Sequence, residues 1–91
     1  MVFSFDTSFK RSLQRYHSVE IIEIKRKLDA FIRIYDTGKI PGGFGLKHIR
    51  KNLWEIRINL PQRILFWKHT GEITFTFIGH HNEIRQFIKH I

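Results

Sequence analysis

The chain contains no cysteine, and only two of its 91 residues are proline. The lack of cysteine excludes disulfides, thiolate metal ligands and a nucleophilic thiol, and it is compatible with a reducing compartment. No apolar run approaches the roughly 20 residues that a membrane-spanning helix needs, and no signal peptide is visible. We therefore expect a cytoplasmic protein with no membrane partner.

Acidic residues are also scarce. The chain has 8 Asp and Glu against 16 Lys and Arg, which gives a formal net charge of +8, and it carries six histidines besides. So large an excess of one sign on a short chain favours a polyanionic partner, such as a nucleic acid or an acidic protein. Ordinary solubility would not require it.

Motifs that would indicate a bound group are missing as well. The GGFG segment is not followed by the Gly-Lys-Ser/Thr of a phosphate-binding loop. No pair of histidines has a zinc-ligand spacing such as HxxxH, and the adjacent His80 and His81 would point apart on a strand. No Ser-His-Asp arrangement can be identified. We therefore expect neither a metal ion nor a cofactor.

Three strand patterns follow one another between residues 53 and 81. Residues 53–60 alternate apolar and polar side chains, residues 63–69 are more apolar, and residues 72–80 are rich in β-branched and aromatic types. Pro61-Gln62 and Thr70-Gly71 are the turn signals between them. The pattern predicts an antiparallel meander with one apolar face.

The remaining segments read as one short strand and three helices. A strand over residues 2–6 precedes a helical stripe capped by Asp6, Thr7 or Ser8, a longer helix capped by Ser18, and a last helix capped by Asn82. We expect one α+β domain over residues 1–91, of order β-α-α-β-β-β-α, with an antiparallel or mixed sheet packed against an N-terminal αα-hairpin. The residues expected to be largely buried are Phe3, Phe5, Leu13, Ile24, Leu28, Phe31, Ile56, Ile58, Phe75 and Phe77.

Residues 38–52 are expected to form a loop. The segment holds four glycines and a group of basic or histidine side chains, Lys47, His48, Arg50 and Lys51 among them. One interpretation is a flexible connector. The other is a basic flap beside the sheet, in which these four residues bind RNA.

Glu55, Arg57 and Arg63 offer a possible site. Strand parity allows all three to point to the same face of the sheet, with the two arginines on adjacent strands. Two guanidinium groups on a rigid sheet suit a phosphodiester, and a carboxylate between them could take a proton from a 2′-hydroxyl. The alternative is a cross-strand ion pair that contributes only stability.

Histidine and tryptophan extend this hypothesis. An imidazole at the strand exit, either His80 or His81, could protonate a leaving 5′-oxygen, which would complete a set sufficient for metal-free RNA cleavage. Trp67 lies on the same face by parity. It could stack on a base, or it could be core beneath the last helix.

Three segments, FDTSFKRSLQRY, LWEIRINLPQRILFWK and IGHHNEIRQF, together with the order of elements, resemble the RelE/ParE superfamily of toxins. The resemblance implies a RelE-like fold and a ribosome-dependent endoribonuclease that cleaves mRNA and is neutralised by a cognate antitoxin. The resemblance implies that Arg63 binds phosphate and that Arg57 is a supporting basic residue. It implies a functional role for His81 as well, although the match there is weaker. We expect the free toxin to be a monomer or a weak dimer.

The sequence also departs from this pattern. Phe87 stands where several of these nucleases carry a tyrosine, so it could contact RNA but could not exchange a proton. Two alternatives to a nuclease stay open: a ParE-like toxin that binds DNA gyrase, and a non-enzymatic basic module that binds RNA or protein.

Overall fold

The structure is a computed structural model that describes all of residues 1–91. Its elements, in chain order, are β1 (Val2–Phe5), α1 (Thr7–Leu13), α2 (Ser18–Tyr35), the 3-10 turn η1 (Gly42–Phe44), β2 (Leu46–Arg50), β3 (Leu53–Arg57), β4 (Gln62–His69), β5 (Glu72–His80) and α3 (His81–Lys89). None of the helices is both long enough and apolar enough to span a lipid bilayer.

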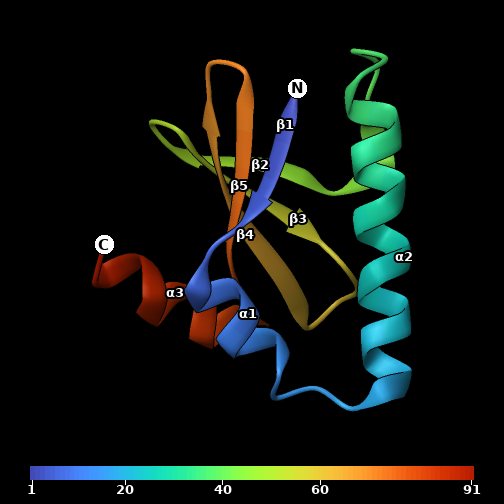
Figure 1. Cartoon of the computed structure of the whole chain (residues 1–91). Helices are drawn as coiled ribbons and strands as arrows, with labels where there is room; N and C mark the ends of the chain where they lie inside the picture. The colour runs from blue at the N-terminus through green and yellow to red at the C-terminus, as the bar shows by residue number, and fades with distance from the viewer.

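The strands form one mixed sheet in the order β1-β5-β4-β3-β2 (Figure 1). β1 runs parallel to β5, while β2, β3, β4 and β5 pair antiparallel in sequence. Two tight connections, around Pro61 and Gly71, join the three strands of the predicted meander. The predicted α+β class with a mixed sheet is therefore confirmed.

The prediction of a loop over residues 38–52 is wrong in its second half. Residues Leu46–Arg50 form β2, an edge strand paired with β3, so the order has one more strand than expected. The strand has few apolar residues and is held by its pairing, which a local pattern does not reveal. Gly45 makes the turn into it at φ 96°, and a Cβ there would lie 3.0 Å from the Cβ of Arg57.

Two helices begin one or two residues earlier than predicted. Asp6 caps α1, as one of the expected alternatives, by accepting from the Phe9 backbone N–H at 3.0 Å. The N-cap residues of α2 and α3, however, are His17 and His80. In each case a glutamate three residues later accepts from the N-cap backbone N–H, and this half of the capping box fixes where the helix starts.

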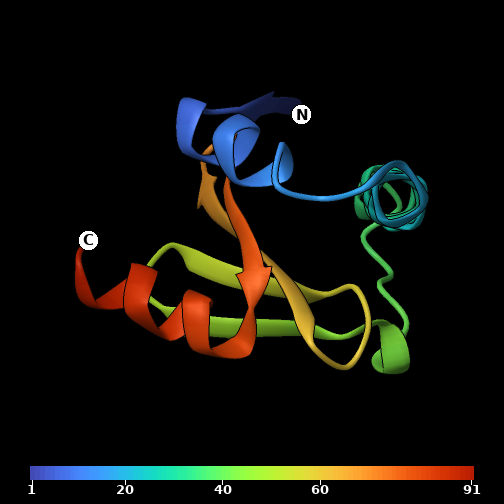
Figure 2. The same ribbon diagram turned by 90° about the horizontal axis from the view of Figure 1, so that it is seen from below.

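The core has two unequal parts on opposite faces of the sheet. α1 and α2 cover one face over a cluster of ten buried residues, and α3 covers the other over a cluster of three, Leu53, Leu65 and Ile84. Figure 2, which looks along α2, separates α3 from the other two helices. Of the ten residues expected in the core, Ile24, Leu28, Phe31, Ile56 and Phe75 are buried and Phe3, Leu13, Ile58 and Phe77 are half-buried.

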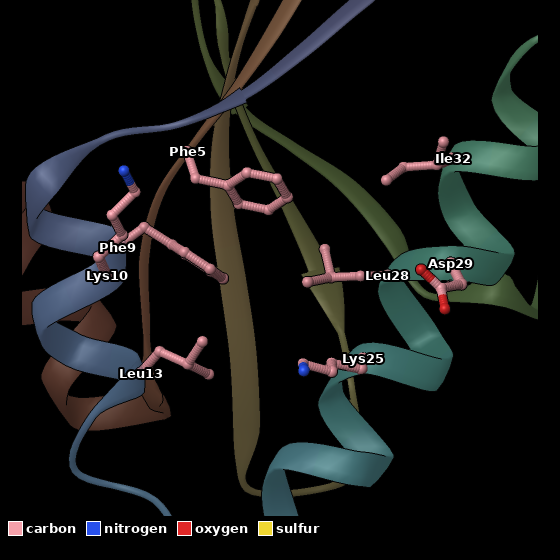
Figure 3. A pocket seen from close by; sticks show the side chains of 8 residues that line it. All are labelled: Phe5, Phe9, Lys10, Leu13, Lys25, Leu28, Asp29 and Ile32. Atoms are coloured by element: carbon pink, nitrogen blue, oxygen red, sulfur yellow. The ribbon is translucent and has the colours of Figure 1, made fainter.

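Phe5 is the exception, because 39% of it is exposed. It ends β1 and lies at an open apolar groove between α1 and α2, the two helices of the predicted hairpin (Figure 3). The groove has a volume of about 330 Å³. Its lining, which is mainly apolar with charged residues among it, consists of Phe5, Phe9, Lys10, Leu13, Lys25, Leu28, Asp29 and Ile32.

Candidate active site

Charged side chains from three adjacent strands meet on the face that α3 covers in part. The register pairs Arg57 with Arg63 across β3 and β4, and it pairs Lys47 with Glu55 across β2 and β3. Paired residues share a face of an antiparallel sheet, so these four lie on one face, with Leu65 opposite Glu55. The predicted grouping of Glu55, Arg57 and Arg63 is therefore present, and β2 adds Lys47.

Arg63 and Glu55 form the centre of this group. The Arg63 Nε lies 3.8 Å from Glu55 Oε2, an ion pair too long to be a hydrogen bond. Glu55 is only 7% exposed, and the Arg63 Nε is itself buried without a hydrogen-bond partner. An Nη atom of Arg63 donates to the Leu60 carbonyl at 3.3 Å. The guanidinium is thus held at one edge while it retains donors for an incoming anion.

Arg57 ends β3 at the border of the group and is exposed. Its backbone N–H donates to the Gly45 carbonyl at 3.1 Å, which ties this strand end to η1. Lys27, on α2, donates to the Phe44 carbonyl at 2.8 Å and lies 3.8 Å from the centre of the Phe44 ring. Burial, and secondarily the charge of Arg57, lowers the pKa of Lys27. Positive charge is therefore concentrated around this corner of the sheet.

The two candidate histidines lie in different places. His81 is the first residue of α3, and its backbone N–H donates at 3.1 Å to the carbonyl of Pro61, in the turn that precedes Arg63. His80 pairs with Gln62 and therefore belongs to the opposite face from Arg63. There it lines a separate polar hollow of about 370 Å³ with Arg15, Tyr16, His17, Glu20 and Glu83. This placement favours His81 over His80 as a partner of Arg63.

Trp67 and Phe87 contribute to packing on the α3 face. Trp67 is half-buried against the cluster of Leu53, Leu65 and Ile84, as the core interpretation expected. Phe87 stacks on Phe77 with ring centres 4.4 Å apart and planes at 16°. Both side chains are half-buried and pack against their neighbours on this face.

The basic residues of the expected flap do not form one surface. Lys47 joins the charged group, whereas Arg50 donates to the carbonyls of Ile88 and Ile91 at 3.2 and 2.9 Å and so caps the end of α3. His48 lies on the other face, 4.6 Å from the Trp54 ring, and Lys51 occupies the turn between β2 and β3.

An ion pair that was not expected from the sequence holds the start of α3. Arg15, just after α1, pairs with Glu83, and a second nitrogen donates to the Ile78 carbonyl at 3.0 Å. The hydrogen bond from Arg15, followed by the one from the His80 backbone, lowers the pKa of Glu83. Burial and the nearby Glu83 charge raise the pKa of Tyr16. The repeated His-x-x-Glu spacing was the only local signal of this cluster.

The candidate site contains the donors for an anion rather than for a metal ion. No group of three or more His, Asp or Glu side chains lies close enough together to hold a metal. Two arginines, a lysine and a buried carboxylate can instead bind a phosphodiester, neutralise added negative charge and take a proton.

Comparisons with solved structures identify the fold. The chain is similar to the toxin in the RelB-RelE antitoxin-toxin complex from Methanococcus jannaschii, with a TM-score of 0.69 and 18% identity over 91% of this chain and 95% of that one. It is similar to a copper-bound mutant toxin from Helicobacter pylori (TM-score 0.71, 13% identity, 92% and 98% covered). YafQ from E. coli gives a TM-score of 0.68 at 8% identity (90% and 94% covered).

No protein-family model and no curated protein sequence matches the chain. At identities this low the structural likeness establishes the fold, which is that of RelE and YafQ toxins, as the sequence resemblance predicted.

Proposed function

We propose that this protein is the toxin of a toxin-antitoxin system and that it cleaves mRNA on the ribosome by attack of a 2′-hydroxyl. The observation that carries the proposal is the pairing of Arg57 with Arg63 beside the buried Glu55 on one rigid face. The toxin fold supports it, because neighbours of this fold include RelE and YafQ. The donor set supports a reaction that needs no metal ion.

In the proposed step Glu55 takes the proton of the 2′-hydroxyl, and that oxygen attacks the adjacent phosphorus. The bond from phosphorus to the 5′-oxygen breaks, and His81 gives the leaving oxygen its proton. The products are a 2′,3′-cyclic phosphate and a 5′-hydroxyl. Arg63 binds the phosphate and stabilises its added charge, with Arg57 and Lys47 alongside it.

The proposal includes a cognate antitoxin, for which the groove between α1 and α2 is suited. The groove is mainly apolar, with Phe5, Phe9 and Leu28 in its lining, and its charged residues are Lys10, Lys25 and Asp29, an excess of one positive charge (Figure 3). An amphipathic helix with acidic residues flanking its apolar stripe would match both features on a chain of net charge +8. Its association rate should fall as salt rises, because the attraction between the charges is screened. A rate that is flat with salt would contradict this mode of binding.

Controlled induction of the protein in bacteria tests the function. We expect growth arrest together with cleavage of messages, seen by primer extension, and relief of both on co-expression of the antitoxin. Growth arrest with a DNA-damage response and intact messages would indicate a gyrase poison instead. Normal growth at high expression would indicate a non-toxic binding module and would overturn the proposal.

A further inference from the structure

We propose a second binding site, for single-stranded RNA, at the end of the sheet where the β2–β3 and β4–β5 turns meet. The site centres on Trp54 and has Lys51 and Lys68 as its cations. It lies on the opposite face from Arg63, since Trp54 packs against the cluster under α1 and α2 while Arg63 pairs on the α3 face. The choice of RNA as its natural ligand rests on the proposed function, whereas the binding itself does not.

The aromatic part of the site is rigid and partly open. Trp54 is half-buried, with its inner part against the main core. His48 lies 4.6 Å from its ring at 39°, and the Lys68 Nζ lies 5.5 Å from the Trp54 ring and 5.9 Å from the Tyr35 ring. A partly open indole that packs against the core and has a lysine beside its ring is an arrangement on which single-stranded bases stack.

A hollow of about 300 Å³ adjoins this tryptophan. Its lining contains basic, polar and aromatic residues but no acidic one: Lys51, Asn52, Trp54, Lys68, His69 and Thr70. The Lys68 backbone N–H donates to the Asn52 carbonyl at 2.8 Å, and so it holds the end of β4 against the β2–β3 turn. The nearby carboxylate of Glu72, on the residue that pairs with His69, is not part of this lining. It accepts a hydrogen bond from the Ser4 hydroxyl at 3.0 Å.

The turn that carries Lys51 has an unusual backbone. Lys51 is the only residue other than glycine with a positive φ, at 45°, and its carbonyl lies 2.6 Å from a ring nitrogen of His48. A lysine in this conformation is uncommon, and here the His48 contact holds it. His48 therefore contacts both the Trp54 ring and the turn that carries Lys51. This link between the aromatic ring and the lysine favours a formed site over unconnected surface lysines.

Tryptophan fluorescence provides a direct test. The chain has two tryptophans, so the Trp67→Phe variant leaves Trp54 as the only one. We would titrate this variant with a short 2′-O-methyl oligouridine, which has no 2′-hydroxyl and cannot be cleaved by the proposed reaction. Quenching of Trp54 is expected. If Trp67→Phe does not fold, the indole N–H resonance of Trp54 in the unaltered protein gives the same readout.

Lysine variants then locate the ligand. In the same background, Lys51→Ala with Lys68→Ala should weaken binding about tenfold at low salt and lower the slope of log affinity against log salt by about 1.4, or about 0.7 for each lost phosphate contact. Lys10→Ala with Lys25→Ala removes equal charge from the groove between α1 and α2 and is the matched control. It should change binding far less, and Arg63→Ala should leave the quenching in place.

Absence of Trp54 quenching would overturn the inference, and so would three further results: equal weakening by the two lysine pairs, loss of quenching on Arg63→Ala, and equal quenching by heparin, a polyanion without bases. The first of these three would show a general charge effect, the second binding on the α3 face, and the third a site with no preference for RNA. Cleavage is assayed separately with ribosomes. Quenching by the oligonucleotide without cleavage would therefore refute the proposed function alone, and cleavage without quenching would refute only this site.

Discussion

The face of the sheet under α1 and α2 buries a cluster of ten residues with four phenylalanines, whereas the face under α3 buries three aliphatic ones. On the first face Phe31 contacts Phe66 and Phe75 with ring centres 5.2 and 6.1 Å apart. On the second, the strands also carry Lys47, Arg57 and Arg63. One face is mainly core, and the other is half core and half site.

The face under α1 and α2 therefore contributes most of the buried core, whereas the face under α3 carries the residues of the proposed reaction. Strands β3 and β4 supply mainly large apolar side chains to the first face and, at alternate positions, both apolar and charged ones to the second. The core on the first face can therefore hold Glu55 and Arg63 in place without competing with them for space. Variants on the two faces should consequently affect different measurements.

The largest expected effect concerns the proton donor. His81→Ala should lower cleavage by a factor of about 10²–10⁴ if this imidazole protonates the leaving oxygen. His80→Ala is the matched variant, one residue away but on the other face, and should lower it much less. Primer extension on mRNA with purified ribosomes measures both, and circular dichroism checks that both fold. Equal losses of cleavage in the two variants would show that the face on which each histidine lies does not decide its role.

Phe31→Ala should be the most destabilising of these variants. Phe31 is fully buried in the larger cluster, so its truncation should lower the free energy of unfolding by about 3–5 kcal/mol. Phe87→Ala, on the half-buried stack of the α3 face, should lower it less. Urea unfolding followed by circular dichroism gives both values. A greater loss for Phe87→Ala would show that the α3 face carries more of the stability than its cluster indicates.

Arg63→Ala should lower cleavage by about two to three powers of ten, the range for loss of one donor to the transition state. The protein should stay folded, although less stable because Glu55 loses its ion-pair partner. Arg63→Lys should recover part of the activity only, since an ammonium does not reproduce the planar fork of donors. Full cleavage by a folded Arg63→Ala protein would remove this residue from the mechanism.

The smallest effect should come from the Arg15–Glu83 pair, which is partly exposed. The pKa of Glu83 is lowered by folding, so its contribution to stability is present above the ordinary value of 4.5 and is lost as pH falls below it. Glu83→Gln should therefore reduce the loss of stability between neutral and acidic pH by less than about 1 kcal/mol. Thermal melts across this pH range test the sign. A steeper loss in the variant would contradict it.

Local patterns in the sequence were enough to predict the helices, the meander and half of the larger core. Ile24, Leu28 and Phe31 repeat at helical spacing, and strand alternation correctly placed Glu55, Arg57 and Arg63 on one face. Segment β2 was missed because an edge strand with few apolar residues has almost no local signal. The starts of α2 and α3 were displaced because the N-cap positions are histidines, a type that capping preferences do not favour.

By itself, the sequence determined the order of elements in outline, the excess of positive charge and the face of the sheet on which Arg63 lies, because period and charge are local properties of the chain. The tertiary structure alone decided the surroundings of each group. It set Lys47 opposite Glu55, turned His80 away from Arg63 and used Arg50 to cap α3. These outcomes depend on strand register and on contacts between residues distant in the chain, which no local pattern encodes.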